Sequence, residues 1–348
     1  MISCCLIVKD ESAVIERCLG WLAPVVGDQG EIVLLDTGST DDTGARAQRF
    51  GERVGVRVRW EQSIRFRPST PPEDFHFACA RNECLLLATG PWLFWCDADD
   101  VMEGPSVLAL VNLLRSQRLG SAPAYRFAYA MADGSEYMRL RLFRRELGLR
   151  FHGACHECIT PPQGTQDIRS IRLIHAPPPR PVGGRASGSI RLRLLEREAQ
   201  EEGRRNARTL FYLANEQRNL GLLWEAVATY ERYLALSRWA EERHCARLFM
   251  AECRAALGER DRALDDLAAA RKEDPRFADS LVLTIRVALD ANREAGGGGS
   301  RKYLEIAEEA LAKLRLLPFP EEAIMFTNRA FYTREFHDRI EGEIRGSG

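Results

Sequence analysis

The sequence predicts an α/β domain built on a mostly parallel sheet, followed by an all-α domain of helical-hairpin repeats. In the first half of the chain, apolar runs of strand length alternate with amphipathic helical patterns. This alternation is typical of a parallel sheet that helices cover on both faces. Beyond residue 190 the pattern is helical, and similar segments recur 37 residues apart, as Ala214 and Ala251 do. Such a period predicts stacked pairs of helices.

The elements of the α/β part follow from hydrophobic periodicity. Strands are predicted at 2–8, 31–36, 54–60 and 91–96, and helices at 11–21, 75–88 and 106–118. A further helix follows the second strand, where Ser39 or Thr40 is expected to be the N-cap and Asp41 and Asp42 to lie in the first turn. From residue 125 the pattern changes to short strands with turns, at 125–131, 136–143, 149–159 and 168–175.

The helical part divides into repeats. Residues 213–230 align with residues 250–267, with Gly221 and Gly258 at the turn between paired helices. The spacing is near the tetratricopeptide period, so we expect a TPR-like array. A third unit is predicted at 277–314 and a closing helix after Pro320. The segment GGGGS at 296–300 is typical of an engineered flexible linker and is left out of the functional interpretation.

A Pro- and Gly-rich stretch separates the two parts. Residues 176–189, APPPRPVGGRASGS, suit neither a helix nor a central strand. We therefore expect a first domain at 1–176, a linker at 177–189 and a repeat domain at 190–345.

Composition excludes several classes of protein. Lys plus Arg number 49 and Asp plus Glu 50, so no overall field favours nucleic acid or an acidic membrane. The first residues, MISCCLIVKDE, have too short an apolar run for a signal peptide, and no stretch is long enough to cross a bilayer. We expect a cytoplasmic protein without a membrane span. Cys155 and Cys158 form a single C-x-x-C, whereas structural zinc usually needs two such pairs, so reduced and mostly buried thiols are favoured.

Polar residues follow the predicted strands at one edge of the sheet. In parallel sheets ligands bind beyond the carboxyl ends of the strands. This rule places Lys9 and Asp10, then Asp36, then Asp97 and Asp99 along one edge, although they are far apart in the sequence.

The acids of FWCDADD, residues 94–100, suit a hard cation. If the strand continues, Asp97 and Asp99 lie on the same side of an extended backbone. Keeping two such carboxylates ionised is costly unless a cation shares them, and oxygen ligands favour Mg²⁺ or Mn²⁺. The alternative is an N-cap role. Asp100, on the opposite side of the strand, is expected to be a structural cap.

Several segments together resemble family 2 glycosyltransferases of the GT-A (Rossmann-like) fold. They are CLIVKDE, LLDTGSTDDT, DFHFACARNECLLLATG, WLFWCDADD, RLFRRELGLRFHGACHE and LIH, within about residues 1–175. The order of the domains further resembles the bacterial members with a C-terminal tetratricopeptide domain, including the bacteriocin (peptide) S-glycosyltransferase group. The set is specific, although each segment alone is modest evidence.

The resemblance implies a nucleotide-sugar site on the first domain. The turn after the first strand should line the nucleotide pocket, with residues Val8, Lys9, Asp10 and Glu11. Asp36 should accept a hydrogen bond from the uracil or ribose, and Arg81 should lie near the base or diphosphate. Without the resemblance, Asp36 could simply cap the next turn, and Arg81 could pair with Asp74 or Glu83.

The resemblance also implies a metal site and a general base. Asp99 matches the direct ligand of Mg²⁺ or Mn²⁺, Asp97 faces the ribose and the metal, and His175 approaches the metal or diphosphate. Glu157 matches the base that removes the acceptor's proton in an inverting transfer. His156 is expected to orient Glu157 or to contact the donor or metal. His76 and His152 are expected to be structural or exposed.

The predicted function is an inverting, metal-dependent glycosyltransferase that uses a nucleotide sugar, most simply a UDP-sugar. Its acceptor would be a Cys, Ser or Thr side chain of a peptide or protein that the repeat domain engages, since repeat arrays offer long concave grooves. Alternatives are a saccharide or lipid-linked glycan acceptor, with the repeats used for homodimerisation, and a non-catalytic scaffold. A nucleotidyltransferase ranks below these, because VKDESAV has a lysine but no glycines.

Overall fold

The structure is a computed structural model of the 348-residue chain. It describes residues 1–131, 134–178, 184–201, 206–294, 301–325 and 327–347. The chain divides into two compact units. The first contains residues 1–133 and 138–184, and the second contains residues 134–137 and 185–348.

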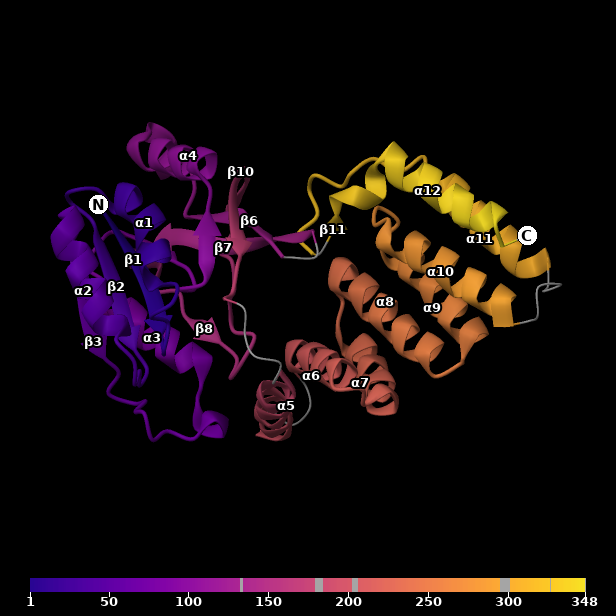
Figure 1. Cartoon of the computed structure of the whole chain (residues 1–348), viewed down its shortest axis with the longest axis horizontal. Helices are drawn as coiled ribbons and strands as arrows, with labels where there is room; N and C mark the ends of the chain where they lie inside the picture. The colour runs from indigo at the N-terminus through magenta and orange to yellow at the C-terminus, as the bar shows by residue number, and fades with distance from the viewer. Residues whose placement is uncertain (132–133, 179–183, 202–205, 295–300, 326, 348) are drawn as a thin grey trace. The chain divides into compact units, whose positions relative to one another are not determined.

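The first unit is built on a mixed, mostly parallel sheet. Its strand order is β3-β2-β1-β4-β7-β6-β10-β5 (Figure 1). Neighbouring strands are parallel from β3 to β4, whereas β7 runs antiparallel to β4 and β5 runs antiparallel to β10. The strands are β1 (Ile2–Val8), β2 (Glu31–Asp36), β3 (Val58–Gln62), β4 (Trp92–Trp95), β5 (Asp100–Met102), β6 (Ala124–Ala130), β7 (Ser135–Arg144) and β10 (Gln166–His175). The predicted α/β class is therefore confirmed.

Helices cover both faces of this sheet. They are α1 (Ile15–Val26), α2 (Thr43–Val54), α3 (Phe77–Leu87) and α4 (Gly104–Arg115). Successive strand residues point to opposite faces, and β4 shows both. The Phe94 ring packs against Trp21 of α1, with centroids 6.0 Å apart. The next residue, Trp95, lies in the core cluster that α3 forms with the sheet through Ala78, Cys84 and Leu85.

Several element boundaries differ from the predictions, and the starts of β3 and α1 are two of them. Helix α2 runs to Val54 and ends at Gly55, whose φ is +75°, so β3 begins at Val58 and not at residue 54. Helix α1 begins at Ile15 and not at residue 11, and the backbone N–H groups of Glu11 and Ser12 donate to the side chains of Thr43 and Asp41.

The predicted N-cap of α2 is wrong by several residues. The helix begins at Thr43, with Asp42 as its N-cap residue and not Ser39 or Thr40. The Asp41 carboxylate supplies the capping contact, because its Oδ1 accepts the Thr43 N–H at 3.0 Å. Both Ser39 and Thr40 instead bond to Asp10 in the preceding loop.

A short hairpin lies between β7 and β10 in the sequence. It consists of β8 (Phe151–His152) and β9 (Cys158–Ile159), which are antiparallel. The predicted continuous strand at 149–159 is wrong, because residues 153–157 form a loop in which Gly153 and His156 both have positive φ. This loop carries Glu157.

The second unit contains paired helices, as predicted. The pairs are α6 (Ala207–Asn219) with α7 (Leu223–Leu236), α8 (Ala240–Ala256) with α9 (Arg260–Glu273), and α10 (Asp279–Glu294) with α11 (Arg301–Leu314), and α12 (Arg334–Arg345) follows (Figure 1). Gly221 and Gly258 have φ of +80° and +83° at the first two turns, a conformation that favours glycine. Buried small residues such as Ala214, Ala226 and Ala251 let the helices approach closely.

The predicted linker is partly helical. Helix α5 (Gly184–Glu201) begins inside the range 177–189. Composition misled the prediction because intrinsic propensity is a weak guide, and burial of Leu194 and Leu195 stabilises a helix that extends toward its polar start. Residues 179–183 and the segment 296–300 lie outside the described residues. Within the part of the chain that the structure describes, the helices are too short or too polar to span a membrane.

Candidate active site

The loops after β1 and β2 are tied together at the carboxyl edge of the sheet. Asp10 has a φ of +54°, a conformation that aspartate tolerates better than most residues. Its Oδ1 accepts the backbone N–H of Thr40 at 2.7 Å, and its own N–H donates to Ser39 Oγ at 3.1 Å. The predicted pocket residues therefore have different surroundings. Val8 is buried, Glu11 is half-buried, and Lys9 and Asp10 are exposed.

Asp36 caps the turn that follows β2. Its Oδ1 accepts the N–H groups of Gly38 at 3.1 Å and Ser39 at 2.8 Å. Gly38 has a φ of +109°, and a Cβ on it would come within 2.6 Å of the backbone at Arg67 and Pro68. Close packing of the loop after β3 therefore requires a glycine here. The buried Asp36 carboxylate holds this turn, and its expected contact with uracil or ribose stays a prediction.

The acids after β4 form a turn and not an extended segment. The Asp100 N–H donates to the Asp97 carbonyl at 3.1 Å, and Asp100 Oδ2 accepts the Asp97 N–H at 3.0 Å. The expectation that Asp97 and Asp99 lie on one side of an extended strand is therefore wrong. The short strand β5 explains the difference, because it begins at Asp100, pairs with β10 and forces the chain to turn first.

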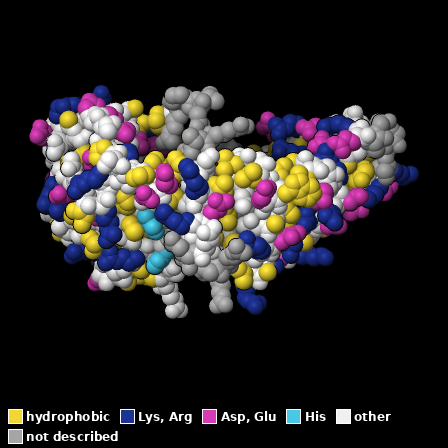
Figure 2. Space-filling model, turned by 90° about the horizontal axis from the view of Figure 1, so that it is seen from below, with side chains coloured by type: hydrophobic (Ala, Val, Ile, Leu, Met, Phe, Trp, Pro, Cys, Tyr) yellow, Lys and Arg dark blue, Asp and Glu magenta, His cyan; other side chains and the backbone are white. Residues whose placement is uncertain are grey.

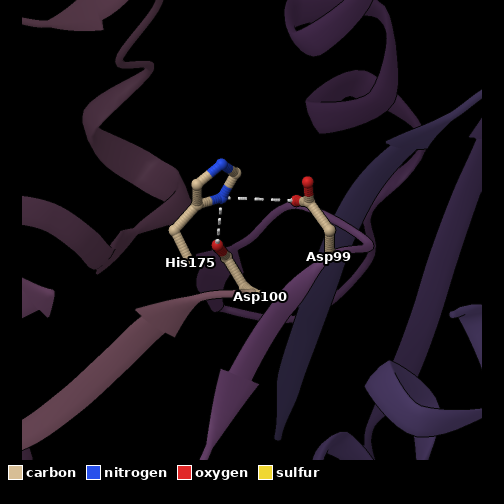
Figure 3. A group of neighbouring side chains, drawn as sticks. All are labelled: Asp99, Asp100 and His175. Atoms are coloured by element: carbon tan, nitrogen blue, oxygen red, sulfur yellow. Dashed lines mark ion pairs between the residues drawn. The ribbon is translucent and has the colours of Figure 1, made fainter. Parts of the chain in front are cut away.

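This turn sends the acids in two directions. Asp97 faces α3 and β7, whereas Asp99 and Asp100 approach His175 at the end of β10 (Figure 3). His175 Nδ1 lies 3.7 Å from Asp99 Oδ1 and 3.9 Å from Asp100 Oδ1. Asp100 performs the capping role predicted for it, and it also completes this group.

The donor set at this position fits a divalent cation. One atom each from Asp99, Asp100 and His175 lies within 4.8 Å of the others. His175 Nδ1 is buried and makes no hydrogen bond among the described residues, so a cation would supply the partner that it lacks. Asp97 lies outside this group, and its predicted role as a ligand is not tested by the geometry.

Asp100 is held from behind by buried residues. Tyr129 donates its hydroxyl proton to Asp100 Oδ1 at 2.7 Å, and Arg141 Nη2 lies 3.1 Å from Oδ2. Burial raises the pKa of Asp100, although the Arg141 guanidinium opposes this shift. Arg17 binds the backbone on the same side, with its Nη2 2.6 Å from the carbonyl oxygen of Ala176.

Arg81 connects Asp97 to Glu157. Its Nε donates to Glu157 Oε1 and its Nη2 donates to Asp97 Oδ1, both at 2.5 Å. Burial by itself would raise the pKa of Asp97, but the guanidiniums of Arg81 and Arg139 outweigh it and hold this pKa well below its usual value. The alternative partners considered for Arg81, Asp74 and Glu83, are not its ion-pair partners in the structure.

The loop with Glu157 is held in place by α3. Asn82, next to Arg81, donates its Nδ2–H to the Phe151 carbonyl at 2.9 Å and accepts the Phe151 N–H at 2.8 Å. The Phe77 N–H at the start of α3 donates to the Ala154 carbonyl at 2.9 Å. The same helix thus positions Glu157 and its partner Arg81. His156 is half-buried with a φ of +52°, and its proposed roles are not tested by these contacts.

Two arginines beside the acidic turn were not predicted from the sequence. Arg139 and Arg141 lie on β7, two residues apart and therefore on one face of the strand. Both guanidiniums lie against Trp95, at 4.5 and 4.1 Å from the ring centroid, and Arg81 lies 4.5 Å from it as well. In YMRLRLF the arginines alternate with apolar residues, so a strand there has one positively charged face. This pattern is the signal that could have identified them.

Comparison with known proteins identifies the first unit. The family model described as glycosyl transferase family 2 matches residues 3–165, which include β1 to β9. The first unit is a family 2 glycosyltransferase domain. Its mostly parallel sheet with antiparallel β7 and β5 is the GT-A-like arrangement that the motifs predicted. The candidate site occupies the carboxyl edge of this glycosyltransferase domain.

Individual relatives match the same part of the chain. A TPR repeat-containing protein of Synechococcus elongatus is 33% identical over 163 residues, which are 45% of this chain and 35% of the relative. The SPbeta prophage-derived glycosyltransferase SunS of Bacillus subtilis is 28% identical over 159 residues, 45% of this chain and 34% of that protein. The chain thus spans about a third of the length of these relatives.

Solved structures give a weaker similarity that is limited to the fold. The crystal structure of S. aureus TarS 1–349 in complex with UDP is 11% identical, with a TM-score of 0.42. The alignment covers 79% of this chain and 92% of that one.

Proposed function

We propose that the chain is an inverting, divalent-cation-dependent glycosyltransferase that transfers a sugar from a UDP-sugar to a side chain of a peptide or protein. The observation that carries the proposal is the link from Glu157 through Arg81 to Asp97, beside the Asp99–Asp100–His175 group in a family 2 domain. A candidate base and a candidate donor site thereby share one buried guanidinium. This shared contact would fix the position of the base relative to the donor.

Glu157 suits the role of general base. Arg81 Nε donates to its Oε1 at 2.5 Å and holds the carboxylate in place. We assign the other oxygen, Oε2, to take the proton from the acceptor's thiol or hydroxyl. The acceptor's sulfur or oxygen then bonds to the anomeric carbon as the bond from that carbon to the diphosphate oxygen breaks, and the electron pair leaves with the nucleoside diphosphate.

Asp99, Asp100 and His175 would hold the cation, with Asp97 directed toward the donor from the opposite side of the turn. Bound Mg²⁺ or Mn²⁺ supplies positive charge that stabilises the leaving diphosphate. His175 Nδ1 is oriented for this contact (Figure 3), and Arg17 keeps the end of β10 in place through the Ala176 carbonyl.

The second unit supports a peptide acceptor. On the first helices of two repeats, arginine guanidiniums lie over partly exposed aromatic rings. The Arg218 guanidinium lies 4.0 Å above Phe249, and the Arg208 guanidinium lies 4.7 Å above Tyr212. Aromatic residues and arginines are enriched at protein–protein interfaces. We assign acceptor binding to this unit.

Donor turnover tests the proposal directly. The chain is mixed with UDP-sugars and GDP-sugars in the presence of Mn²⁺ or Mg²⁺, and free nucleoside diphosphate is measured with and without candidate peptides. We expect release from a UDP-sugar, strongest with peptide. Absence of binding and of release for every donor would contradict the enzymatic function.

Two variants separate the proposed roles. Asp99→Ala should abolish the dependence of turnover on Mn²⁺ and weaken Mn²⁺ binding. Glu157→Gln keeps an oxygen for Arg81, so it should bind UDP normally and lose turnover by a factor of about 10² to 10⁴. Unchanged turnover in either variant would contradict the role assigned to that residue.

Matched peptides are needed to identify the acceptor atom. Pairs that differ only by Cys→Ser distinguish transfer to sulfur from transfer to oxygen, with the product identified by mass spectrometry. Transfer to a free saccharide or lipid-linked glycan, with none to any peptide, would replace the peptide acceptor by the saccharide acceptor.

A further inference from the structure

Two neighbouring helices of the second unit share a cluster of side chains on one face. Helices α6, α8 and α10 are the first members of three successive pairs (Figure 1), and α8 packs against both of the others. The Arg218 guanidinium of α6 lies 4.0 Å above the Phe249 ring of α8, and its Nη1 donates to Glu252, also on α8. Since residues three apart lie on one face of a helix, Phe249 and Glu252 form a single surface with Arg218.

Asn215 adds hydrogen-bond donors to this surface. It lies three residues before Arg218 on α6 and therefore on the same side of the helix. Its Oδ1 accepts the hydroxyl proton of Tyr230 at 2.6 Å, and this bond fixes the orientation of the amide. Asn215 is half-buried, and its Nδ2 makes no hydrogen bond within the part of the chain that the structure describes. The amide thus presents N–H donors that suit a carbonyl oxygen of a ligand.

Arg286 brings a second positive charge to the same surface from α10. Burial raises the pKa of Glu252, and the charges of Arg218 and Arg286 oppose this shift, so both guanidiniums act on one carboxylate. Arg218 forms the ion pair with Glu252. Arg286 is exposed and has no ion-pair partner among the described residues. The acid one turn further along α10, Asp290, pairs with Arg293 at 2.9 Å.

The charges on this surface do not cancel. Arg218 balances Glu252, whereas Arg286 remains without a carboxylate of the protein's own. The half-buried Phe249 ring supplies apolar area, and Asn215 supplies donors. An occupant that matches the surface therefore carries a carboxylate, an apolar side chain and a backbone carbonyl close together. A peptide with an acidic residue near an apolar one has all three, whereas a neutral saccharide has neither the carboxylate nor the apolar side chain.

We propose that this surface, made of Asn215, Arg218, Phe249, Glu252 and Arg286, binds an acidic and apolar segment of the acceptor peptide. Arg286 pairs with an aspartate or glutamate side chain of the peptide, the apolar side chain packs on Phe249, and Asn215 donates to a backbone carbonyl. The inference rests on the proposed function, because it names the class of peptide that the second unit selects. Complementary charges decide which partner binds more than how tightly it binds, so Arg286 is a specificity-determining residue.

Peptide binding to the full chain tests the inference without sugar transfer. The probes are two fluorescent sets of short amidated peptides built from Cys, Ser, Leu, Phe and Gly, with Glu at chosen positions in one set and Gln there in the other. Fluorescence anisotropy gives the affinities. We expect the Glu set to bind about twofold to fivefold more tightly than the Gln set, which is the size of one exposed ion pair.

Charge reversal at Arg286 sharpens the test. Arg286→Glu should bind the Gln set more tightly than the Glu set, because like charges then meet. A third set, with Lys at the same positions, should bind more tightly to Arg286→Glu than to the wild type. A Gln set with a free C-terminal carboxylate identifies the source of the charge. If it binds as tightly as the amidated Glu set, the protein recognises the peptide terminus, and the proposed contact with an acidic side chain is overturned.

Arg232→Glu is the matched control. Arg232 is exposed on α7, the second helix of its pair, and forms no ion pair with the described residues. This variant changes the net charge of the chain as Arg286→Glu does, so it should keep the wild-type order of the Glu and Gln sets. Thermal unfolding checks that each variant is folded.

The possible failures are distinguishable. Equal binding of the Glu and Gln sets, no binding of any set, or an unchanged order in Arg286→Glu would overturn the inference, and nucleotide release with a peptide would still support the proposed function. Binding of the sets in the expected order, without nucleotide release from any donor, would contradict the enzymatic function and leave the peptide-binding surface in place.

Discussion

Arg81 bonds Glu157 through Nε and Asp97 through Nη2, each at 2.5 Å. The two carboxylates come from a loop after β8 and a turn after β4, so one side chain on α3 joins two distant segments of the glycosyltransferase domain. The arginine is buried, and its guanidinium also lies 4.5 Å from the ring centroid of Trp95 and 5.5 Å from that of Phe151. This arrangement predicts a large effect of substitution on both stability and activity.

Replacement of Arg81 by methionine should destabilise the domain by about 3–5 kcal/mol, because two acids at the site lose their shared partner. Arg81→Lys should recover part of the stability, since it keeps the charge, but not the activity, because one ammonium group cannot hold both carboxylates in this geometry. Urea unfolding gives the free energies, and donor turnover gives the activities.

The double variant Arg81→Met with Glu157→Gln isolates the ion pair. It should be more stable than Arg81→Met alone, because the amide of glutamine costs less to bury than an unpaired carboxylate. Additive free energies in this cycle would show that the two residues are not coupled and would contradict the interpretation.

Asn82 should act as a positioning residue for Glu157. Its side chain makes two hydrogen bonds to the backbone of Phe151, where the loop with Glu157 begins. Asn82→Ala is expected to lower stability by about 1–3 kcal/mol. It should also reduce kcat by about tenfold to a hundredfold, because small displacements of a catalytic group are costly.

The split between kcat and binding distinguishes positioning from a general loss of structure. Donor affinity in Asn82→Ala should stay near the wild-type value, because Asp99 and His175 lie in other segments, the turn after β4 and the end of β10. Asn219→Ala, at the exposed end of α6, is the control and should change neither quantity. Equal losses in kcat and in UDP affinity would contradict the positioning role.

Sequence patterns predicted the parts of the site that depend on strand order, and not those that depend on turns. Apolar runs placed Asp36 and Asp97 at one edge, because the carboxyl ends of parallel strands must meet there. The turn at Asp97–Asp100 was not predicted, since it depends on the pairing of β5 with β10, two segments that are distant in sequence. The partners of Arg81 were not predicted either, because they too come from segments that are distant from it in sequence.

The repeat unit shows the converse case. Helix pairs could be predicted from a single period, because each repeat packs on its neighbours through the same small residues. The start of α5 could not be predicted, because its first residues have weak helix propensity and tertiary packing decides the length of the helix.

Replacing two glycines of the second unit by alanine should change the free energy of unfolding in opposite directions. Gly342 lies inside α12 and is exposed, and a Cβ there would meet no atom within 4 Å. Gly342→Ala should therefore stabilise the protein by roughly 0.5–1 kcal/mol, through helix propensity. Gly258 lies in the turn between α8 and α9 with a φ of +83°, and a Cβ there also meets nothing within 4 Å. Gly258→Ala should destabilise by about 1 kcal/mol or more, through backbone strain alone.

Urea unfolding of both variants beside the wild type checks this pair. Because neither substitution creates a clash, the difference in sign isolates the backbone conformation. A stabilising effect of Gly258→Ala would mean that the turn does not require the left-handed conformation.

The Asp41 carboxylate at the start of α2 should make the free energy of unfolding depend on pH. Asp41 accepts the N–H groups of Thr43 at 3.0 Å and Ser12 at 3.1 Å. Burial would raise the pKa of Asp41, but hydrogen bonds from the Thr43 hydroxyl and from these N–H groups outweigh burial and lower the pKa to about 2. Since the folded-state pKa lies below the unfolded value of about 3.9, this contribution is fully present above the unfolded value and is lost as the pH falls toward the folded one.

Asp41→Asn measures that contribution, because its side chain has no carboxylate to titrate. The loss of stability relative to the wild type should be constant near neutral pH and should shrink between about pH 4 and about pH 2. Unfolding by urea at a series of pH values gives the difference, and Asp28→Asn, at an exposed position, should show no such change. A difference that stays the same down to pH of about 2 would mean that the Asp41 carboxylate does not stabilise the fold as an anion, and that the two N–H groups are satisfied equally well by a neutral oxygen.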